Sequence, residues 1–532
     1  MTSSPLLHIS ALLLLLTVEA FQPLNFATPF NRNSLDSRKS NPTQQTSKSN
    51  PLQATQQSIS STASTTSTTS NPSNLGCWLP VASVSGIEDL LPMNVKIANI
   101  DCVVWKDSNE NWAVQKDECA HRLVSLSQGR ISEDGGGRIE CPYHGWQFNT
   151  TGQLQHIPQA PPSSSSFCFS DDTSLTNFET HVTDDLLWAF FPSMATNEFL
   201  DKAELPETVY PSLMSAPLNS SKYFVRELPY SFDFLVENFM DPAHIPFAHH
   251  GLQGVRSDGC PIPMRSIKNA VNYSHVEVSF EDTIREKPRT GIVSFQRPCY
   301  YHFRTQSGEN GEMKPNLQIF VVPIHEGRCR VLFVSPLTKS FIPNWLEHAA
   351  SNRFLNTDIW LHEAEITVRN KMREEGRDGG GGDPVEMKMY QQPTSSDNGV
   401  RAWRKWWKEY GMSASPKGTF GAADSENMVL LTRKDQIDPW EGHSKDCSHC
   451  RRAMKKFKKA IIVAKLSRPV LGISFLLKAR FSKALSLNSM LGVFIAVEFA
   501  SLLTRAFSNK AIRIITGEEA FNVNDRSASA LS

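Results

Sequence analysis

The sequence predicts an α+β protein built from three successive parts, and three observations lead to this prediction. Residues 75–192 contain short apolar or alternating runs separated by Asn, Asp and Gly, which is typical of strands joined by turns. Residues 220–440 combine longer strand-like runs with polar periodic stretches, as in helices packed on an antiparallel sheet. Residues 461–505 are largely apolar and suit hydrophobic helices that anchor a protein to a membrane.

The first 74 residues are predicted to lie outside this fold. A short apolar run at residues 12–16 ends at Thr17-Val-Glu-Ala20, which is typical of a signal peptide over residues 1–20. Residues 21–74 continue as basic, Ser-rich sequence and then as Ser, Thr, Gln and Asn with almost nothing to bury, which predicts a transit peptide and a disordered linker. This order resembles the bipartite leader of algae with secondary plastids, and plain secretion is the alternative.

Two Cys–His pairs stand nineteen residues apart in the small β domain. The first segment supplies Cys119 and His121, and the second supplies Cys141 and His144. Two thiolates and two imidazoles suit a [2Fe–2S] cluster in which the histidines hold one iron and the cysteines the other. Zinc also accepts this ligand set. A zinc finger, however, usually takes both cysteines from one segment and both histidines from another, so the interleaved order favours the cluster.

A second group of possible metal ligands follows about a hundred residues downstream. Two histidines with a distant carboxylate form the facial triad of a mononuclear Fe(II) centre, which leaves positions open for O₂. Asp241 and His244 are three residues apart and share one face if this stretch is helical. Their spacing would let the carboxylate hydrogen-bond the imidazole. Because the sequence ENFMDPAHIPFAH follows the two Cys–His pairs along the chain, it predicts that His244 and His249 bind iron.

These motifs make the chain resemble the Rieske-type aromatic-ring and tetrapyrrole oxygenases. The flanking sequences resemble the chloroplast branch of that family, which contains pheophorbide a oxygenase, its protochlorophyllide-oxidising relatives and the translocon-associated Rieske protein of the inner envelope. The resemblance covers roughly residues 75–505. The segments that carry it are WLPV at 78, YHGWQF at 143, HIPQA at 156, YQQPTSSD at 390 and CSHC at 447.

The resemblance implies a Rieske [2Fe–2S] domain over residues 75–192 and a helix-grip, or START-like, catalytic domain over residues 220–440. A third iron ligand should be a carboxylate on a long helix over Asn344 to Glu375. There LNTDIWLHEAE is similar to a family stretch in which Asp358 matches the Asp. Because the family's Gln is Glu365 here, Glu363 and Glu365 stay open as alternatives.

The resemblance further implies an O₂-dependent monooxygenase that acts on a chlorophyll-derived tetrapyrrole, with pheophorbide a as the leading substrate and ferredoxin as electron donor. Asp241, with Asn238 beside it, is expected in a catalytic role, passing electrons between the cluster of one subunit and the mononuclear iron of the next in a homotrimer. Hydroxylation of protochlorophyllide, chlorophyllide or a phyllobilin, and a redox-sensing role in the import machinery, are the alternatives. Fifty-four basic and fifty-four acidic residues give no indication of a nucleic-acid partner.

The C-terminal sequence predicts attachment to a plastid membrane, in the envelope or the thylakoid, with the catalytic domain facing the stroma. Residues 441–460 include a basic cluster that suits anionic headgroups. Residues 461–479 are apolar but interrupted by charges, whereas Leu485 to Leu503 is cleaner. Nineteen helical residues rise about 28 Å, close to one hydrocarbon core. Either this segment spans the membrane, or both lie on its surface, and residues 506–532 form a tail.

Cys447 and Cys450 form a CxxC motif beside that anchor. Such a pair can act as a redox switch, and the resemblance implies thioredoxin as its partner. Zinc binding with His443 or His449 and two ordinary thiols are the alternatives. The six cysteines outside the cluster loops and the CxxC are scattered, so a disulfide scaffold is not predicted.

Overall fold

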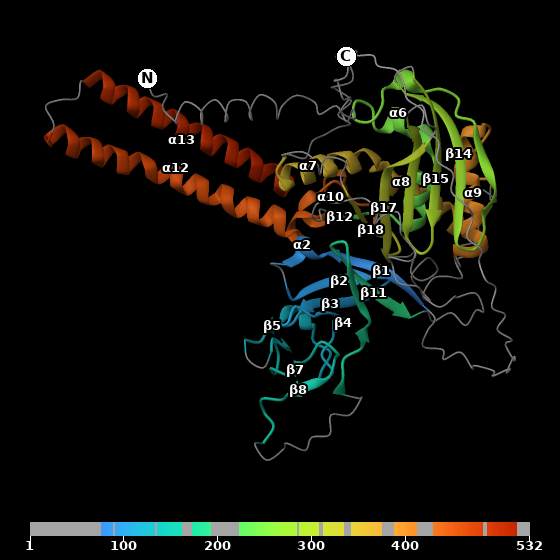
Figure 1. The fold of residues 1–532 in the computed structure, drawn as a ribbon, viewed down its shortest axis with the longest axis horizontal. Coiled ribbons are helices and arrows are strands. Elements are labelled where there is room, and N and C mark those ends of the chain that lie inside the picture. The colour runs from blue at the N-terminus through green and yellow to red at the C-terminus, as the bar shows by residue number, and fades with distance from the viewer. Residues whose placement is uncertain are drawn as a thin grey trace, which may run out of the picture. The chain divides into compact units, whose positions relative to one another are not determined.

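Figure 1 shows the fold of the chain in a computed structural model. The structure describes residues 76–518 apart from residues 89–90, 134–135, 162–172, 193–222, 285–286, 308–311, 335–341, 375–387, 412–428 and 482–486. The predicted signal peptide, transit peptide and linker, and most of the predicted tail, lie outside the described residues.

The N-terminal part contains β-sheets, as predicted (Figure 1). The predicted run VKIANIDCVVWKD forms two strands joined by a two-residue turn at Ala98 and Asn99. Both turn residues have positive φ, 53° and 61°, which is the backbone of the type I′ turn that matches the twist of a hairpin. The three antiparallel sheets have the orders β1(Gly76–Ser83)-β11(Leu186–Pro192)-β10(Thr180–Thr183), β2(Met93–Ile97)-β3(Ile100–Lys106)-β4(Trp112–Lys116)-β9(Asn177–Phe178) and β5(Arg130–Ile131)-β6(Ile139–Glu140)-β7(Gln147–Phe148)-β8(Leu154–His156).

The second part mixes sheet and helices, which confirms the α+β prediction. Its sheet has seven antiparallel strands in the order β12(Tyr223–Leu228)-β18(Arg328–Val334)-β17(Glu312–His325)-β16(Tyr300–Ser307)-β15(Lys287–Gln296)-β14(His275–Ile284)-β13(Met264–Val271). Two helices, α5 (Phe232–Phe239) and α9 (Asn398–Trp406), pack on this sheet. Trp403 of α9 lies in the same buried core as Leu235 of α5 and Phe295 of the sheet.

The long helix predicted over residues 344–375 is in fact broken. The structure has α7 (Asn344–Leu355), a 3₁₀ turn η7 (Asn356–Asp358) and α8 (Trp360–Glu374). The turn consists of Asn-Thr-Asp, whose side chains compete with the helix for backbone hydrogen bonds. Thr357 donates its hydroxyl proton to the Phe354 carbonyl, 2.6 Å away. The break matters because it buries the side chains of Thr357 and Asp358.

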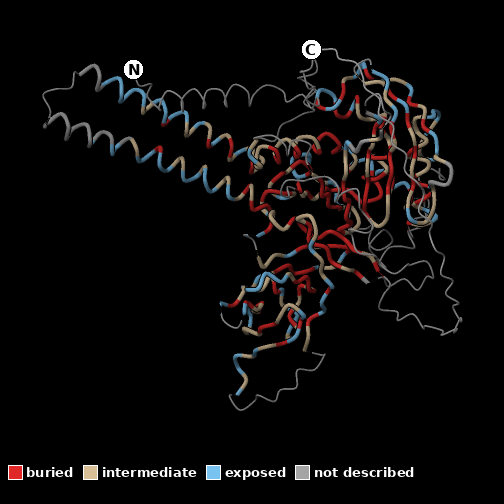
Figure 2. The backbone as a smooth tube through the Cα atoms, in the orientation of Figure 1, coloured by how far each residue is buried: buried red, intermediate tan, exposed pale blue. Residues whose placement is uncertain are grey.

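The hydrophobic core continues across the predicted boundary between the two parts (Figure 2). Trp188 of β11 packs edge-on against Phe320 of β17, with ring centroids 5.1 Å apart. The Ala98 backbone NH also donates to the Pro323 carbonyl at 2.9 Å. The two parts share buried side chains, so the boundary between residues 192 and 220 is a change of topology and does not separate two cores.

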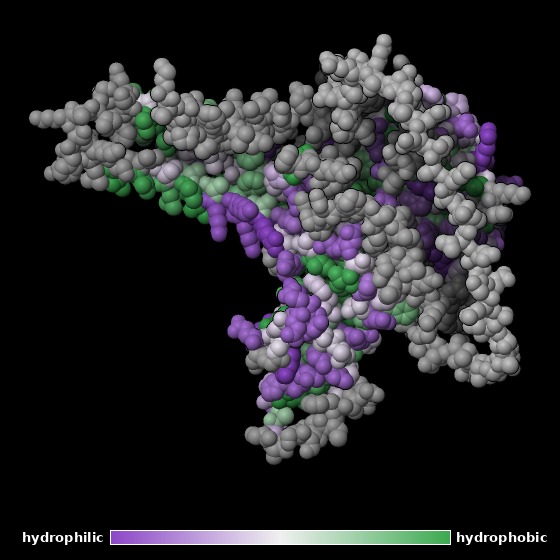
Figure 3. Space-filling view, viewed as in Figure 1, coloured by the Kyte–Doolittle hydropathy of each residue, from purple (hydrophilic) through white to green (hydrophobic). Residues whose placement is uncertain are grey.

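The last two helices, α12 (Ser448–Phe481) and α13 (Leu487–Thr516), lie side by side (Figure 1). The Ser501 hydroxyl donates to the Ala464 carbonyl at 2.6 Å, and Phe457 contacts Phe507. Both contacts fit an antiparallel hairpin. Figure 3 shows hydrophobic side chains along part of the hairpin. The exposed hydrophobic residues of the two helices include Ile462, Val463, Leu466, Val470, Ile473, Leu491, Val493, Ile495, Phe499 and Leu502.

One stretch within the described residues, Leu491–Thr516, is long and apolar enough to cross a membrane. It begins six residues later than the predicted span Leu485 to Leu503, and it ends later because the helix continues past the predicted anchor end at 505. Ile515 in its final turn is buried and packs against Cys447 and Cys450 at the start of α12. Beyond residue 505 the chain therefore continues as a helix for about three turns, and the end of this helix packs against the start of α12.

Candidate metal centres

The two Cys–His loops lie next to each other, as an iron–sulfur cluster requires. The imidazoles of His121 and His144 are 4.7 Å apart between ring centroids. The Trp146 ring stacks on His121 at 4.5 Å with an angle of 4° between the planes. The second loop turns tightly because the Gly145 NH donates to the Cys141 carbonyl at 3.1 Å, with Gly145 at φ +73°. That left-handed conformation favours glycine.

The two histidines lie beside each other, as do the two cysteines, and this arrangement fits a [2Fe–2S] cluster. Histidine faces histidine, while the buried thiols of Cys119 and Cys141 lie beside each other. Burial, with the neighbouring thiol, raises the pKa of Cys119 to about 11, so that bonding to a metal is what would hold this sulfur as thiolate. The buried Nδ1 atom of His121 has no hydrogen-bond partner among the described residues. A [2Fe–2S] cluster with histidines on one iron and cysteines on the other uses this arrangement.

A second site forms where α5 ends. After α5 the chain makes a 3₁₀ turn, η5 (Pro242–His244), and a short helix, α6 (Ile245–Ala248), and these turns bring His244 and His249 together. Their Nε2 atoms are 3.2 Å apart. An Asp358 carboxylate oxygen, from η7, lies 3.6 Å from the His249 Nε2. Of the described residues, these three offer ligand atoms within 4.8 Å of one another.

The hydrogen bonds around this site fix both imidazoles in the form that can bind a metal. The His244 Nδ1 faces the backbone carbonyl of Asp241, which can only accept, so this nitrogen carries the proton. The His249 Nδ1 lies 2.5 Å from the Thr357 hydroxyl. Since that hydroxyl gives its own proton to the Phe354 carbonyl, the His249 Nδ1 must also be the donor. Both Nε2 atoms therefore direct lone pairs toward each other, an arrangement that a cation between them stabilises.

Asp358, and neither glutamate alternative, is the carboxylate at the histidine pair. Glu363 is exposed on α8. Glu365 is fully buried but engaged elsewhere: it accepts a hydrogen bond from the Ser231 backbone NH at 2.8 Å and pairs with Arg369 at 2.9 Å. Burial raises the pKa of Asp358 to about 6, whereas the nearby His244 acts in the opposite direction. A cation at the site would favour the ionised carboxylate.

Asp241 contacts its histidine differently from the prediction. The backbone carbonyl of Asp241, not its carboxylate, accepts the hydrogen bond from His244. The carboxylate instead caps η5 by accepting from the Ala243 NH at 2.9 Å, because Asp at this position satisfies a free NH of the turn. Burial raises the pKa of the Asp241 carboxyl. Asn238, the other predicted catalytic residue, lies beside Asp358 and lowers its pKa.

The CxxC cysteines lie apart from both predicted iron sites. Cys447 and Cys450 are buried and are not paired in a disulfide. His443 lies beside the two cysteines, as expected in the zinc alternative. His348 of α7 lies there as well, and the sequence did not indicate it. His348 precedes Cys450 by 102 residues, and no local spacing connects them.

Comparison with known proteins gives two family matches, to the Rieske [2Fe–2S] domain over residues 77–179 and to pheophorbide a oxygenase over residues 295–375. The chain is 30% identical to pheophorbide a oxygenase of Oryza sativa subsp. japonica, over 72% of this chain and 73% of the relative. It is 27% identical to protochlorophyllide-dependent translocon component 52 of Arabidopsis thaliana, over 73% and 75%. It is 28% identical to flavonoid 8-hydroxylase 2 of Ocimum basilicum, over 71% and 73%.

Proposed function

This chain belongs to the chloroplast Rieske oxygenases, the family of pheophorbide a oxygenase, and we propose that it oxygenates a chlorophyll-derived tetrapyrrole, with pheophorbide a as substrate. Membership of this family makes the chain an O₂-dependent oxidoreductase whose cofactors are a [2Fe–2S] cluster and a mononuclear iron. When bound, the cluster supplies electrons one at a time and the mononuclear iron activates O₂.

The ligands in this proposal are Cys119, His121, Cys141 and His144 for the cluster, and His244, His249 and Asp358 for the mononuclear iron. The observation that carries it is the pair of facing Nε2 lone pairs with a buried carboxylate beside them. The Asp241 carbonyl and the Thr357 hydroxyl hold the Nδ1 protons and orient the rings. Asp358 would balance part of the charge of a bound cation, and the burial of His249 and Asp358 limits the access of water to this side of the site.

The same proposal gives ferredoxin as donor, a homotrimer as assembly, and Asp241 as the residue that links the centres of neighbouring subunits. Asp241 suits that position because its backbone already contacts the iron ligand His244, while its carboxyl caps η5. The seven-stranded sheet with α5 and α9 is the part that would form the helix-grip cavity for the tetrapyrrole.

Location in a plastid membrane, with the catalytic domain in the stroma, is part of the proposal. The apolar stretch Leu491–Thr516 supports the anchor, and the bipartite leader supports the plastid. The intact protein should stay in the membrane fraction after a carbonate wash, and protease added from the stromal face should remove the Rieske domain. Extraction by carbonate would contradict a spanning helix, and protection from protease would contradict the orientation.

The decisive experiment supplies the purified full-length protein with pheophorbide a, reduced ferredoxin and ¹⁸O₂. A product that contains ¹⁸O and an opened macrocycle is expected, and a His249→Ala variant should give none. Disruption of the gene should make pheophorbide a accumulate in the living cell. No turnover of pheophorbide a by a protein loaded with both cofactors would contradict the proposed substrate.

A second candidate, a redox-sensing role in protein import, is favoured by the similarity to the translocon component, which covers as much of this chain as the similarity to pheophorbide a oxygenase. Pigment profiles of the same disruption separate these functions. An import defect with normal pigments would support the second candidate. Accumulated protochlorophyllide, chlorophyllide or a phyllobilin would instead identify a different pigment substrate.

A further inference from the structure

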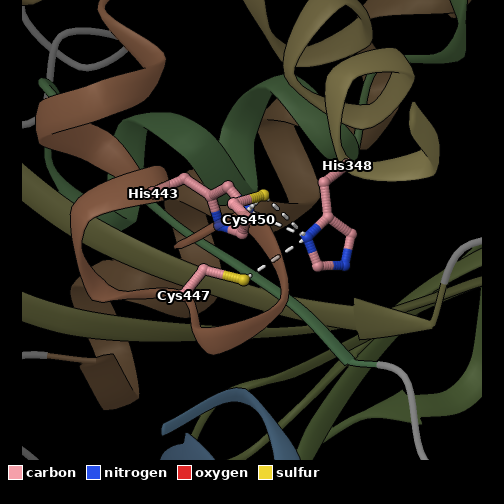
Figure 4. Close-up of side chains that lie close together, drawn as sticks. All are labelled: His348, His443, Cys447 and Cys450. Atoms are coloured by element: carbon pink, nitrogen blue, oxygen red, sulfur yellow. Dashed lines mark hydrogen bonds between the residues drawn. The ribbon is translucent and has the colours of Figure 1, made fainter. Parts of the chain in front are cut away.

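Four metal-binding side chains meet in one buried place outside the two iron sites (Figure 4). His348 comes from α7, while His443, Cys447 and Cys450 come from the short segment between α11 (Pro439–Gly442) and the first turn of α12. Each of the four is at most 5% exposed. In Figure 4 the two sulfur atoms and the two imidazoles point at one another.

The three nitrogen–sulfur distances are those of a tetrahedral zinc site, and the nitrogen–nitrogen distance is about 0.3 Å shorter than such a site requires. The His348 Nδ1 lies 3.5 Å from each sulfur atom and 3.0 Å from the His443 Nε2. The Cys450 sulfur lies 3.4 Å from the same His443 nitrogen. Zinc bonds of about 2.3 Å to sulfur and about 2.0–2.1 Å to nitrogen give tetrahedral edges of roughly 3.3–3.8 Å.

A single hydrogen bond can account for only one of the three contacts at the His348 Nδ1. A ring nitrogen has either one proton or one lone pair, yet three donor atoms converge on the Nδ1 of His348. The hydrogen bond of His443 leaves this second histidine in a form that can bind a metal. The His443 Nδ1 donates to the Val225 carbonyl at 2.6 Å, so its Nε2 carries the free lone pair, which is the usual support for a metal-bound histidine.

The position of Cys447 also favours thiolate. Cys447 directly precedes α12, a helix of 34 residues, and the N-terminus of a helix stabilises negative charge. Thiolate is the form that binds zinc.

We propose that His348, His443, Cys447 and Cys450 form a closed structural zinc site that fastens the start of α12 to α7. Two cysteines and two histidines with no open position are the ligand set of structural zinc. The site is independent of the substrate of the enzyme. Cys447 and Cys450 are 5% and 2% exposed, so a partner protein cannot reach either thiol directly, and the geometry suits a metal better than thiol exchange.

The test measures metals in the full-length protein, purified anaerobically in detergent from cells supplied with iron and zinc. Elemental analysis should give about one zinc per chain in addition to iron. X-ray absorption at the zinc edge should show two sulfur ligands at about 2.3 Å and two nitrogen ligands at about 2.0–2.1 Å. This measurement on the unaltered protein does not depend on whether any variant folds.

Variants then locate the zinc, because a misloaded cluster site would offer the same ligand types. His348→Ala should lose zinc and keep the cluster, whereas His144→Ala should lose cluster iron and keep zinc. His348→Cys should keep zinc with three sulfur ligands and one nitrogen, a change that only a direct ligand can produce. Cys260→Ser, at a half-buried cysteine far from the group in sequence, is the matched control and should change neither metal.

Three results would overturn the proposal. The first is a protein that carries iron but no zinc. The second is zinc that disappears with His144→Ala but stays with His348→Ala. The third is a Cys447–Cys450 disulfide in the native protein together with absent zinc, which would instead support the redox switch.

Discussion

The candidate ligands of the cluster and of the mononuclear iron differ in which kind of side chain is half-buried. At the cluster loops Cys119 and Cys141 are buried, while both histidines are half-buried and His144 lies beside the exposed Tyr143. At the mononuclear site His249 and Asp358 are 3% and 2% exposed, and His244 is half-buried. The histidine side of the cluster would therefore lie nearest to a partner protein that delivers electrons, whereas the buried pair would limit the access of water to the mononuclear iron.

The two sites also obtain their rigidity differently. The cluster ligands sit on tight loops fixed by backbone hydrogen bonds within each loop. At the proposed mononuclear site His244 is held locally by the Asp241 carbonyl, whereas His249 is oriented by Thr357, 108 residues away in the sequence. Changes within the cluster loops should therefore disturb the cluster alone, and changes in η7 should disturb the iron site alone.

The largest effect is expected from His249→Ala. Loss of a direct ligand should lower oxygenation by more than about 100-fold. The rhombic EPR signal of the reduced cluster should stay unchanged, because no cluster ligand is touched. His250→Gln, at the exposed neighbouring histidine, is the control and should retain activity. A cluster signal lost together with activity would show that the two sites are not independent.

Asp241→Asn should keep both metals and still turn over on the order of 100-fold more slowly, at the upper end of the effect of a residue beside a metal ligand. The amide oxygen can still accept from the Ala243 NH, so η5 should form normally. Iron content, cluster EPR and turnover with reduced ferredoxin are measured on one preparation. Near-normal turnover would refute the role of the carboxylate between the two centres.

Thr357→Val removes one hydroxyl group and keeps the volume of the side chain. His249 then loses the acceptor of its Nδ1 proton and the ring is no longer held in the metal-binding form. Affinity for the mononuclear iron should fall about tenfold, measured by iron titration of the cluster-loaded protein. Thr357→Ser keeps the hydroxyl and should behave like the unaltered protein; equal affinity in both variants would argue against the tautomer assignment.

The smallest effect is expected from Gly145→Ala, on the cluster side. A side chain at φ +73° costs roughly 1–2 kcal/mol, and the added carbon would lie 3.0 Å from the Pro158 ring. Thermal release of the cluster should begin at a lower temperature, with the mononuclear site unchanged. Gly136→Ala has a similar backbone with no neighbour within 4 Å and should spare the cluster.

The sequence predicts best what is local. Cys119 and His121 lie within a few residues of each other, as do His244 and His249, so their spacing alone indicates that they bind a metal. Asp358 came from a family resemblance and not from spacing, since the histidines are more than a hundred residues away. The break in the helix over 344–375 was missed, although the polar triplet Asn-Thr-Asp is a signal for such a break.

No local sequence pattern indicated that Thr357 or His348 takes part in a metal site. Their partners are a side chain 108 residues away and a cysteine 102 residues away, and only the packed sheet and helices bring them together. The antiparallel strands were predictable from alternating apolar residues. The buried continuity between β11 and β17 was not, because a pattern of alternation does not say which two sheets will share a core.

Helix α7 connects the proposed zinc site with the proposed iron site. His348 lies inside this helix, and Thr357 and Asp358 follow directly after its end. The buried Arg226 holds the same end of the helix through the Asn352 carbonyl at 2.8 Å and the Asn356 side chain at 2.6 Å. If zinc occupies the group around His348, it should therefore act together with Arg226 to fix the place of Asp358, whereas the cluster loops share no residue with α7.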